Sequence, residues 1–485
     1  MPDYQTDRLS ACFNIASGDV EDAPALDPLA KFEIIEKSGA VYIKGEESTI
    51  KSSRRQPNVK CSAQGPEKVL IIGGGSGTMG AVQALREQNF KGGITVLTRE
   101  SSLPFDRTKL SKALLDDKNA LQWRDDAWYK SADVKFVEDE ATGVDFSKKS
   151  VSTKSGTSFP YTILILATGG TPNMLPLPGF KDLGNVFLLR TIPHVKAILS
   201  AVGEKKGKNI VVIGSSFIGM EVANCLAANN TVTVVGMESA PMERVMGAEV
   251  GKIFQKQVGK NGVKFYLSAS VDSAVASSSD SSVVGSVKLK DGTTLPADLV
   301  ILGVGVKPET SFLKDNPAVP LEKDGSLRTN EAFQVQGLDD VFAIGDIATY
   351  PYHGPGGDGK PVRIEHWNVA QNAGRSVAKS ITQPGSKPKP FIPVFWSALG
   401  SQLRYCGNTM ASGWDDLVLQ GQPEEGKFAA FYAKGETVVA VASMQMDPMM
   451  TYSAELMRRG KMPGKQALRD GLDVTTVDLP AEVKI

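Results

Sequence analysis

The chain has 485 residues, of which 41% are hydrophobic, and its 54 basic side chains balance its 54 acidic ones. At roughly 150 residues per domain, this length predicts three or four domains. A net charge of zero gives the chain no electrostatic reason to bind nucleic acid or an anionic membrane. Its longest apolar runs are too short to span a bilayer. The acidic N-terminus also lacks the apolar stretch of a secretory signal.

The four cysteines are widely scattered, at Cys12, Cys61, Cys225 and Cys406. Because no CxxC pair occurs, the sequence predicts neither a zinc site nor a redox-active dithiol, and we expect no bound metal. Free thiols fit a reducing compartment, so we expect the protein to be cytoplasmic or mitochondrial.

The first part of the chain contains a hairpin pattern. The run "KFEIIEKSGAVYIKG" places two β-rich stretches around Ser38-Gly39. Two strands cannot bury a core of their own, and residues 51–67 are polar, basic and contain Pro and Gly, which is typical of a linker. We therefore expect residues 1–55 to be dispensable for cofactor binding by the rest of the chain.

A βαβ unit begins at Lys68, where "KVLIIGGGSGT" predicts a buried strand and a glycine-rich turn before a helix. Gly73 permits the tight turn, and Gly75 lets the backbone approach a pyrophosphate at the helix N-terminus. The third small residue of the motif, which packs helix against strand, is Thr78. The strand and helix on either side favour dinucleotide binding over a glycine-rich turn without a ligand.

An acidic side chain is expected at the end of the second strand of such a unit, where it binds the adenosine ribose. Arg99 takes that place here, and Glu100 follows it. Glu100 either contacts the ribose or forms a solvated charge pair, and the sequence leaves both alternatives open.

The same pattern returns about 140 residues later in "KNIVVIGSSFIGMEVANCLAANNTVTVVGME", which predicts an internal duplication of the dinucleotide-binding unit. Its turn runs from Gly214 to Gly219, and Ser216 takes the middle position, where a hydroxyl can reach a phosphate. Gly236 replaces the usual acid after the second strand, and Glu238 is the nearest substitute. No arginine follows that strand directly, as a 2′-phosphate would require, so the sequence favours NADH over NADPH.

Three further apolar strands end in small residues, in "ILILATGGTPN", "LPADLVILGVGVKP" and "VFAIGD". From about residue 376 the pattern changes to antiparallel strands followed by a helix, which predicts a separate domain. The predicted fold class is therefore α/β, with two Rossmann-like dinucleotide-binding domains, a C-terminal α+β domain and an N-terminal β segment.

Two other segments are dense in polar side chains. "LPFDRTKLSKALL" leads from an Asp-Arg pair into a short helix with Lys109 and Lys112, and alone it is typical of a capped surface helix. "RIEHWNVAQNAGRSVA" places His366, one of only three histidines, beside Trp367 at the start of a helix. Simple packing would also explain why His366 and Trp367 stand side by side.

Taken in order, "DRTKLSK", "ATGGTPN", "FIGMEVA", "VFAIGD", "EHWNVAQNAG" and "FWSALGSQLRYCG" resemble the FAD-dependent pyridine nucleotide oxidoreductases. They most resemble the apoptosis-inducing-factor 3-like branch, which is related to the NADH:ferredoxin reductases. The similarity covers residues 68 to about 450 and implies a glutathione-reductase-like FAD/NAD(P) fold. Three domains are implied: an FAD-binding domain in 66–187 and 308–378, an NAD(P)H-binding domain in 188–307, and a C-terminal α+β interface domain in 379–485.

In this branch a Rieske [2Fe–2S] domain precedes the reductase, and residues 1–55 resemble the second half of such a domain. The second pair of cluster ligands would fall at Thr6 and Leu9, which cannot bind iron. We therefore expect a truncated Rieske-like β segment without an iron–sulfur cluster, either because the sequence is truncated or because the cluster has been lost.

The resemblance also implies the site residues. Those expected at FAD are Gly73, Gly75, Thr78, Glu100, Arg107, Lys112, Thr168, Gly169, Asp346, Glu365, His366 and Trp367. Those expected at the nicotinamide nucleotide are Gly214, Phe217, Ile218, Glu238 and Gly305. Lys112 and Glu221 are the predicted catalytic residues, paired beside the flavin, where a fixed cation stabilises the negative charge of the reduced ring.

The implied function is that of an oxidoreductase that takes hydride from NADH to FAD and passes electrons to an external acceptor. That acceptor is an iron–sulfur protein, a quinone or oxygen. The alternative is a redox-sensing interaction protein, in which reduction by NADH controls assembly rather than turnover. The expected partners are NADH and an unidentified acceptor, with no nucleic acid and no membrane span, in a monomer or a homodimer.

Overall fold

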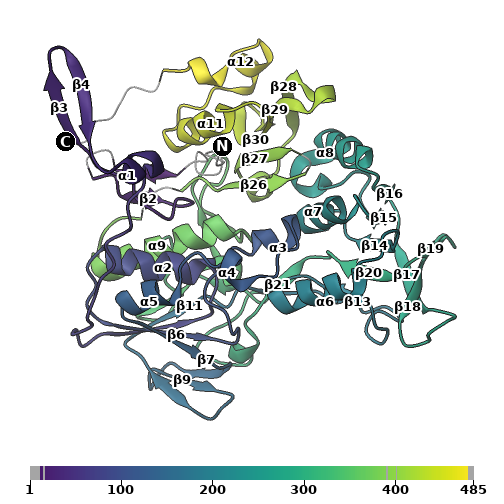
Figure 1. The fold of residues 1–485 in the computed structure, drawn as a ribbon, viewed down its shortest axis with the longest axis horizontal. Coiled ribbons are helices and arrows are strands. Elements are labelled where there is room, and N and C mark those ends of the chain that lie inside the picture. The colour runs from purple at the N-terminus through teal and green to yellow at the C-terminus, as the bar shows by residue number, and fades with distance from the viewer. Residues whose placement is uncertain (1–10, 15–16, 389–390, 400, 479–485) are drawn as a thin grey trace.

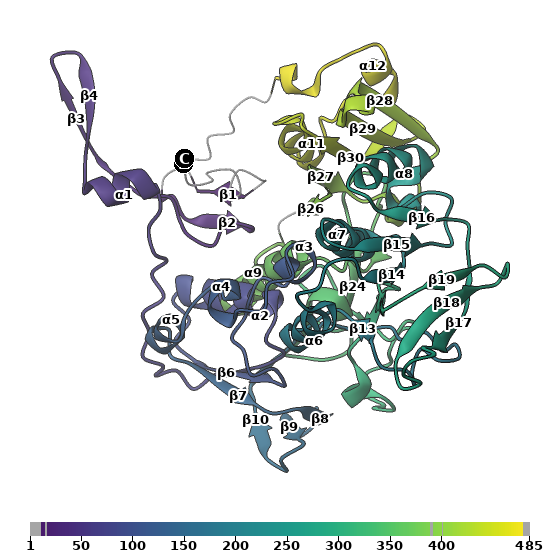
Figure 2. The ribbon, with the colours of Figure 1, turned by 45° about the vertical axis from the view of Figure 1, so that its right-hand side comes forward.

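The computed structural model describes residues 11–14, 17–388, 391–399 and 401–478, and it contains two parallel five-stranded sheets that lie beside each other (Figure 1). A third, antiparallel sheet packs against them on the side of α7 and α8, as the turned view shows (Figure 2). The two parallel sheets with helices on their faces, and the separate C-terminal domain, confirm the predicted fold class.

The first parallel sheet has the strand order β23-β11-β5-β6-β7. Its central strands are runs of Val, Ile and Leu that are buried on both faces, as a parallel sheet covered by helices requires. The strands are β5 (Lys68–Ile72), β6 (Gly93–Thr98), β7 (Val134–Glu138), β11 (Ile163–Leu166) and β23 (Val341–Ala343). The associated helices are α2 (Ser76–Glu87), α3 (Thr108–Lys112), α4 (Lys118–Leu121), α5 (Asp126–Ser131) and α9 (Trp367–Thr382).

The second parallel sheet has the order β13-β20-β14-β15-β16 and repeats the strand–turn–helix–strand pattern of the first. Its strands are β13 (Val186–Leu188), β14 (Asn209–Ile213), β15 (Thr231–Val235), β16 (Lys264–Tyr266) and β20 (Leu299–Leu302). Its helices are α6 (Ile192–Val202), α7 (Phe217–Leu226) and α8 (Glu243–Lys260). Two antiparallel strands, β12 (Gly170–Pro172) and β21 (Val306–Pro308), pair where the chain enters and leaves this unit.

The C-terminal sheet is antiparallel, as predicted, in the order β26-β27-β30-β29-β28. Its strands are β26 (Val394–Ala398), β27 (Gln402–Gly407), β28 (Asp416–Gln422), β29 (Lys427–Lys434) and β30 (Thr437–Met444). Its helices are α10 (Thr409–Ser412), α11 (Met449–Arg458) and α12 (Lys465–Arg469).

Small sheets and turns complete the body of the protein. The strands are β8 (Ala141–Asp145), β9 (Ser150–Thr153), β10 (Ser158–Pro160), β17 (Val271–Ala276), β18 (Val284–Leu289), β19 (Thr294–Pro296), β22 (Leu327–Arg328), β24 (Ala348–Tyr352) and β25 (Lys360–Val362). The 3₁₀ turns are Ser311–Leu313, Gly345–Ile347, Pro423–Glu425 and Val474–Thr476.

The N-terminal segment begins with β1 (Cys12–Phe13) and β2 (Val20–Asp22). The predicted hairpin follows as β3 (Glu33–Lys37) and β4 (Ala40–Lys44), and then comes α1 (Glu47–Ser52). Figures 1 and 2 show the hairpin projecting from the body, whereas β2 lies against it. The positions inferred for cluster ligands, Thr6 and Leu9, lie outside the described residues.

Within the described part of the chain, no helix is long and apolar enough to cross a membrane. The same residues hold no group of three or more His, Cys, Asp and Glu side chains placed to bind a metal ion.

Helices α2 and α9 cross in direct backbone contact because glycines face each other there. A Cβ on Gly80 would lie 2.2 Å from the carbonyl oxygen of Gln371, and one on Gly374 would lie 2.3 Å from that of Gly77. Neither position has room for a side chain, since backbone cannot move aside as a flexible side chain can.

We expect Gly80→Ala to lower the free energy of unfolding by about 1–3 kcal/mol, because the methyl group overpacks the helix crossing. The matched control is Gly259→Ala in α8, where a Cβ would meet nothing within 4 Å. That substitution should stabilise by about 0.5–1 kcal/mol through helix propensity. Denaturant unfolding measures both, and equal effects would show that the α2–α9 contact is not tight.

Candidate functional site

A cavity of about 1140 Å³ opens at the carboxyl end of the first parallel sheet, where the end of β13 from the second sheet and the start of α7 also reach it. Its walls come from the turns after β5, β6, β11, β13 and β23, from the start of α7, and from β26 and β27 of the C-terminal domain. Ligands of open α/β sheets bind in this kind of crevice, outside the carboxyl ends of the strands.

The glycine-rich turn after β5 forms one end of the cavity. Gly73 has a φ of 115°, and a Cβ there would lie 2.1 Å from the carbonyl oxygen of Ala167. A Cβ on Gly75 would meet nothing within 4 Å, so protein does not fill the space beside that backbone. Gly75 is also the N-cap of α2 and supplies no side-chain cap. The first N–H groups of this helix are therefore available to a phosphate.

The structure agrees with the packing role predicted for Thr78 but not with its predicted contact with FAD. This side chain is fully buried, does not line the cavity, and donates a hydrogen bond of 2.6 Å from its hydroxyl to the carbonyl oxygen of Gly73. It braces the turn from behind and cannot touch a cofactor. Ser76 lines the cavity in its place, and Gly80 lets α2 pack closely against α9.

The acid after β6 is held by an arginine. The Glu100 carboxylate accepts a hydrogen bond of 2.5 Å from Arg107, and both side chains line the cavity. Arg107 also donates to the carbonyl oxygen of Arg190 at 2.8 Å. The half-exposed Arg99 also lines the cavity and contacts Glu309 at 3.3 Å. Glu100 is placed for a ribose, and its charge is paired rather than solvated.

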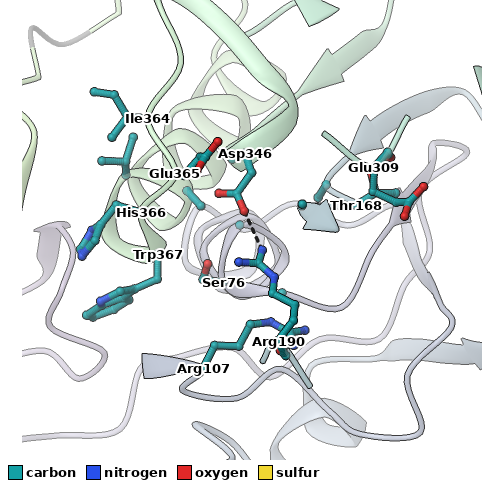
Figure 3. A pocket seen from close by; sticks show the side chains of 18 of the residues that line it. Ser76, Arg107, Thr168, Arg190, Glu309, Asp346, Ile364, Glu365, His366 and Trp367 are labelled. Atoms are coloured by element: carbon teal, nitrogen blue, oxygen red, sulfur yellow. Dashed lines mark hydrogen bonds and ion pairs between the residues drawn. The ribbon is translucent and has the colours of Figure 1, made fainter. Parts of the chain in front are cut away.

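Asp346, which follows β23, pairs with an arginine that sequence reasoning missed. The Arg190 guanidinium donates to its carboxylate at 2.6 Å, drawn as the dashed line in Figure 3. Thr168 and Gly169 lie across the same part of the cavity, where the Thr168 hydroxyl donates to the carbonyl oxygen of Glu309 at 2.6 Å. Arg190 is the second residue after the short strand β13, and no glycine motif marked that strand.

His366 and Trp367 form an aromatic wall of the cavity, side by side in Figure 3. His366 is the N-cap of α9, and its Nδ1 accepts a hydrogen bond from the backbone N–H of Asn368, so the ring proton lies on Nε2. Burial, with a further contribution from the Lys112 charge, lowers the pKa of His366 to about 3. Burial raises the pKa of the neighbouring Glu365 carboxyl, although that side chain keeps about a third (36%) of its surface accessible.

The two predicted catalytic residues meet in the wall of the cavity. The Lys112 ammonium from α3 lies 3.0 Å from the Glu221 carboxylate of α7, and Glu221 is only 4% exposed. Ser111 donates to the other Glu221 oxygen at 2.5 Å, and Ser397 of β26 also donates to this carboxylate. Every oxygen of the buried carboxylate is therefore partnered, which a buried charge requires.

The second glycine turn lies mostly outside the cavity. Phe217 and Ile218 line it, and Phe217 packs edge-on against Phe395 with ring centroids 5.1 Å apart. Gly214 closes its turn against the second sheet, since a Cβ there would lie 2.2 Å from the carbonyl oxygen of Gly303. Gly305 has a φ of 87° and its carbonyl oxygen accepts from the Asn173 N–H, so it shapes a turn at the entrance to β21.

A cation lies near Glu238, although no arginine directly follows β15 in the sequence. Arg244, in the first turn of α8, contacts the Glu238 carboxylate at 2.9 Å and also lines the cavity. The turn between β15 and α8 brings Arg244 close to Glu238. The sequence did not indicate this contact, because Arg244 does not directly follow the strand. Glu238 itself is not part of the cavity lining.

These residues fit a flavin dinucleotide. The open cradle at Gly75 and the uncapped start of α2 suit a pyrophosphate. Glu100 suits the adenosine ribose, Asp346 suits a hydroxylated chain, and the aromatic wall of His366 and Trp367 suits a planar ring.

The same architecture is found in proteins of known family. Residues 67–374 match the family model described as pyridine nucleotide-disulphide oxidoreductase, and residues 394–475 match the one described as reductase C-terminal. Apoptosis-inducing factor 3 of Mus musculus and of Homo sapiens is 34% identical over 460 residues, which cover 93% of this chain and 74% of that protein. Monodehydroascorbate reductase, chloroplastic/mitochondrial, of Arabidopsis thaliana is 26% identical and covers 84% of this chain and 87% of its own.

Solved structures agree with this. A ferredoxin reductase from Rhodopseudomonas palustris superimposes with a TM-score of 0.76 at 28% identity, covering 82% of this chain and 96% of that one. The covalent putidaredoxin reductase–putidaredoxin complex gives 0.75 at 26% identity, over 82% of this chain and 94% of that one.

Two nucleotide-binding units that share one cavity define an oxidoreductase of the two-dinucleotide class. The chain belongs to the pyridine nucleotide-disulphide oxidoreductase family. It is an NAD(P)H-dependent FAD oxidoreductase. Both matched models begin at or after residue 67, so the interpretation of residues 1–55 as a Rieske remnant stays a prediction.

The low pKa of His366 predicts a measurable effect of pH on stability. Between the ordinary pKa of 6.5 and about 3, the unfolded chain takes up a proton at this side chain that the folded chain does not. His366 therefore does not reduce the free energy of unfolding above pH 6.5. Below pH 6.5 it reduces that free energy by up to about 1.4 kcal/mol per pH unit as the pH falls. His366→Asn keeps an acceptor for the Asn368 N–H but cannot titrate. The free energy of unfolding of His366→Asn should fall less steeply between pH 6 and pH 4 than that of the wild type. Parallel pH profiles of the two proteins would contradict this.

Proposed function

We propose that the protein takes hydride from NADH to bound FAD at the Lys112–Glu221 pair and passes the electrons to an external acceptor. The observation that carries this proposal is the position of the pair, which joins the two nucleotide units inside one cavity. When bound, FAD supplies the ability to accept two electrons as a hydride and to release them one or two at a time.

The residues around the pair prepare the site for negative charge. Lys112 holds a fixed positive charge at the cavity wall, and Glu221 fixes the position of its ammonium with the help of Ser111 and Ser397. Such preorganised charge is effective because it needs no rearrangement when electron density arrives. The neutral His366 can donate from Nε2 without adding a second buried cation.

Other contacts orient the nucleotides and keep water out. Phe217 and Phe395 pack edge-on at the junction of the second unit and the C-terminal domain. The Glu100–Arg107 and Asp346–Arg190 pairs hold their carboxylates in fixed positions on the cavity wall. Fixed partners of this kind bring two reactants together at low entropic cost.

The acceptor is proposed to be an iron–sulfur protein, a quinone or oxygen. Support comes from the relatives, whose names include ferredoxin reductases and monodehydroascorbate reductases. No CxxC pair occurs in the sequence, so an internal dithiol acceptor is not available. A monomer or homodimer in the cytoplasm or the mitochondrion remains the proposed state.

The test is anaerobic stopped-flow bleaching of the flavin absorbance by NADH. We expect the purified protein to bleach, and Lys112→Ala to bleach at least about tenfold more slowly, since it loses roughly 1.4 kcal/mol of transition-state stabilisation. Glu221→Ala should also be slower. The loss of rate in the double variant should be smaller than the combined losses of the two single variants, because the two side chains act as a unit.

The matched control is Lys109→Ala on the same helix. Its ammonium donates to the carbonyl oxygen of Ala120 and does not line the cavity, so its rate should equal that of the wild type. If Lys112→Ala keeps its flavin and bleaches at the wild-type rate, the pair is only structural.

Selectivity for NADH is the second expectation. Glu238 would repel a 2′-phosphate. It also pairs with Arg244, an arginine that could otherwise bind that phosphate. We expect kcat/KM to favour NADH by about 10-fold to 150-fold, which corresponds to roughly 1–3 kcal/mol. Glu238→Gln should reduce this preference at least about fivefold by releasing Arg244. Glu249→Gln on α8 removes the same charge elsewhere and should leave the preference unchanged; equal use of both nucleotides by the wild type would refute the assignment.

A redox-controlled interaction is the second candidate function, favoured by the exposed hairpin. Ile34, Val41 and Ile43 are 54–66% exposed on β3 and β4, which is unusual for side chains of this size. Light scattering with and without NADH separates the two functions. Sustained turnover with ferricyanide or a quinone at constant size supports the enzyme, whereas a change of size without turnover supports the alternative.

A further inference from the structure

The N-terminal segment is joined to the flavin site by buried contacts. Residues 20–27 lie against α2 and α9, and Val20, Ala23 and Ala25 are each at most 6% exposed. Arg375 of α9 donates to the backbone carbonyl oxygens of Val20 and Glu21. This packing is more than the loose attachment of a linker.

One buried chain of hydrogen bonds runs from this segment to the aromatic wall. The Ala23 N–H donates to the Asn372 side-chain oxygen at 2.8 Å, and the Asn372 amide group donates to the side-chain oxygen of Asn368 at 3.1 Å. The backbone N–H of Asn368 then donates to Nδ1 of His366, which lines the cavity. Asn368 and Asn372 are both buried, so water does not compete for these bonds.

The chain also reaches the C-terminal domain. The Asn368 side-chain amide donates to the carbonyl oxygen of Val394 at 3.3 Å. The next residue of that strand, Phe395, packs against His366 with ring centroids 5.4 Å apart. Asn368 therefore holds both the histidine and its aromatic neighbour.

A second connection starts three residues further along the segment. Arg124 donates to the carbonyl oxygen of Leu26 at 2.8 Å and to the Asp27 carboxylate at 2.7 Å, and its side chain is 8% exposed. Its neighbour Trp123 lies against Trp367 with ring centroids 5.9 Å apart. The two connections thus end on adjacent residues of one wall, His366 and Trp367.

We propose that residues 20–27 position the aromatic wall of the flavin site, with Asn372 as the positioning residue that transmits their placement to His366. This rests on the proposed function, because it takes the flavin ring to lie against His366 and Trp367. The segment is part of the oxidoreductase itself, and its hydrogen bond to Asn372 sets the orientation of the His366 ring. A change in that orientation alters the environment of the bound flavin without removing any group that touches it.

The competing explanation is that the segment only adds stability. Two variants of the full-length, flavin-loaded protein separate these alternatives. Asn372→Ala removes the bonds to both Ala23 and Asn368, whereas Arg375→Ala removes bonds to Val20, Glu21 and Glu87 and leaves the path to His366 intact. Both should unfold at a lower temperature than the wild type.

Only Asn372→Ala should change the flavin. We expect its visible circular dichroism to differ from that of the wild type. We also expect the ratio of its affinities for reduced and oxidised flavin to change at least about threefold, a midpoint-potential shift of about 14 mV for a two-electron couple. Arg375→Ala should match the wild type in both measurements. Equal changes in the two variants, or none in Asn372→Ala, would overturn the proposal.

If Asn372→Ala does not fold, Asn372→Ser, which keeps a hydroxyl but cannot span both partners, is measured in the same way and judged by the same criteria. A wild-type protein that carries no flavin or is not bleached by NADH would contradict the proposed function. A wild type that bleaches, beside variants with unchanged flavin spectra and potentials, contradicts the positioning role alone.

Discussion

The close crossing of α2 and α9 is the constraint on which the rest of the site depends. Glycines on both helices bring backbone against backbone, since a Cβ on Gly80 or Gly374 would overlap a carbonyl group. The first helix carries the phosphate-binding turn at its N-terminus, and the second carries His366 and Trp367 at its own. Holding the two starts together places a backbone cradle and an aromatic wall on one cavity, although they come from distant parts of the chain.

Paired charges then shape the cavity without leaving any of these acids unpartnered. Glu100 is held by Arg107, Asp346 by Arg190 and Glu221 by Lys112. Each pair fixes a carboxylate whose burial alone would be costly. The histidine in the wall stays neutral because burial and the Lys112 charge both oppose its protonation. The result is a cavity whose polar groups are held in place before a ligand arrives, as preorganised sites require.

The N-terminal segment shows how a piece that resembles a remnant can belong to the enzyme. Its hairpin projects away from the body, but residues 20–27 bury small side chains and backbone groups on α2 and α9. Buried backbone N–H and carbonyl groups must find partners, and those partners are the side chains of Gln83, Arg124, Asn372 and Arg375. Without this segment, these polar side chains of α2 and α9 would be expected only on a solvent-exposed surface. Here they bind the backbone of residues 20–27.

The sequence by itself determined the fold class, the two nucleotide units, the C-terminal domain and the glycine turns, because strand and helix periods and tight turns are local properties of the chain. It also indicated Lys112 and Glu221, through a resemblance that spans several motifs. Only the tertiary structure decided that Thr78 does not reach the cavity, because its hydroxyl is held by the carbonyl oxygen of Gly73 behind the turn. The same holds for Arg190 and Asn372, whose partners Asp346 and Ala23 lie far away in the sequence and were brought to them by packing.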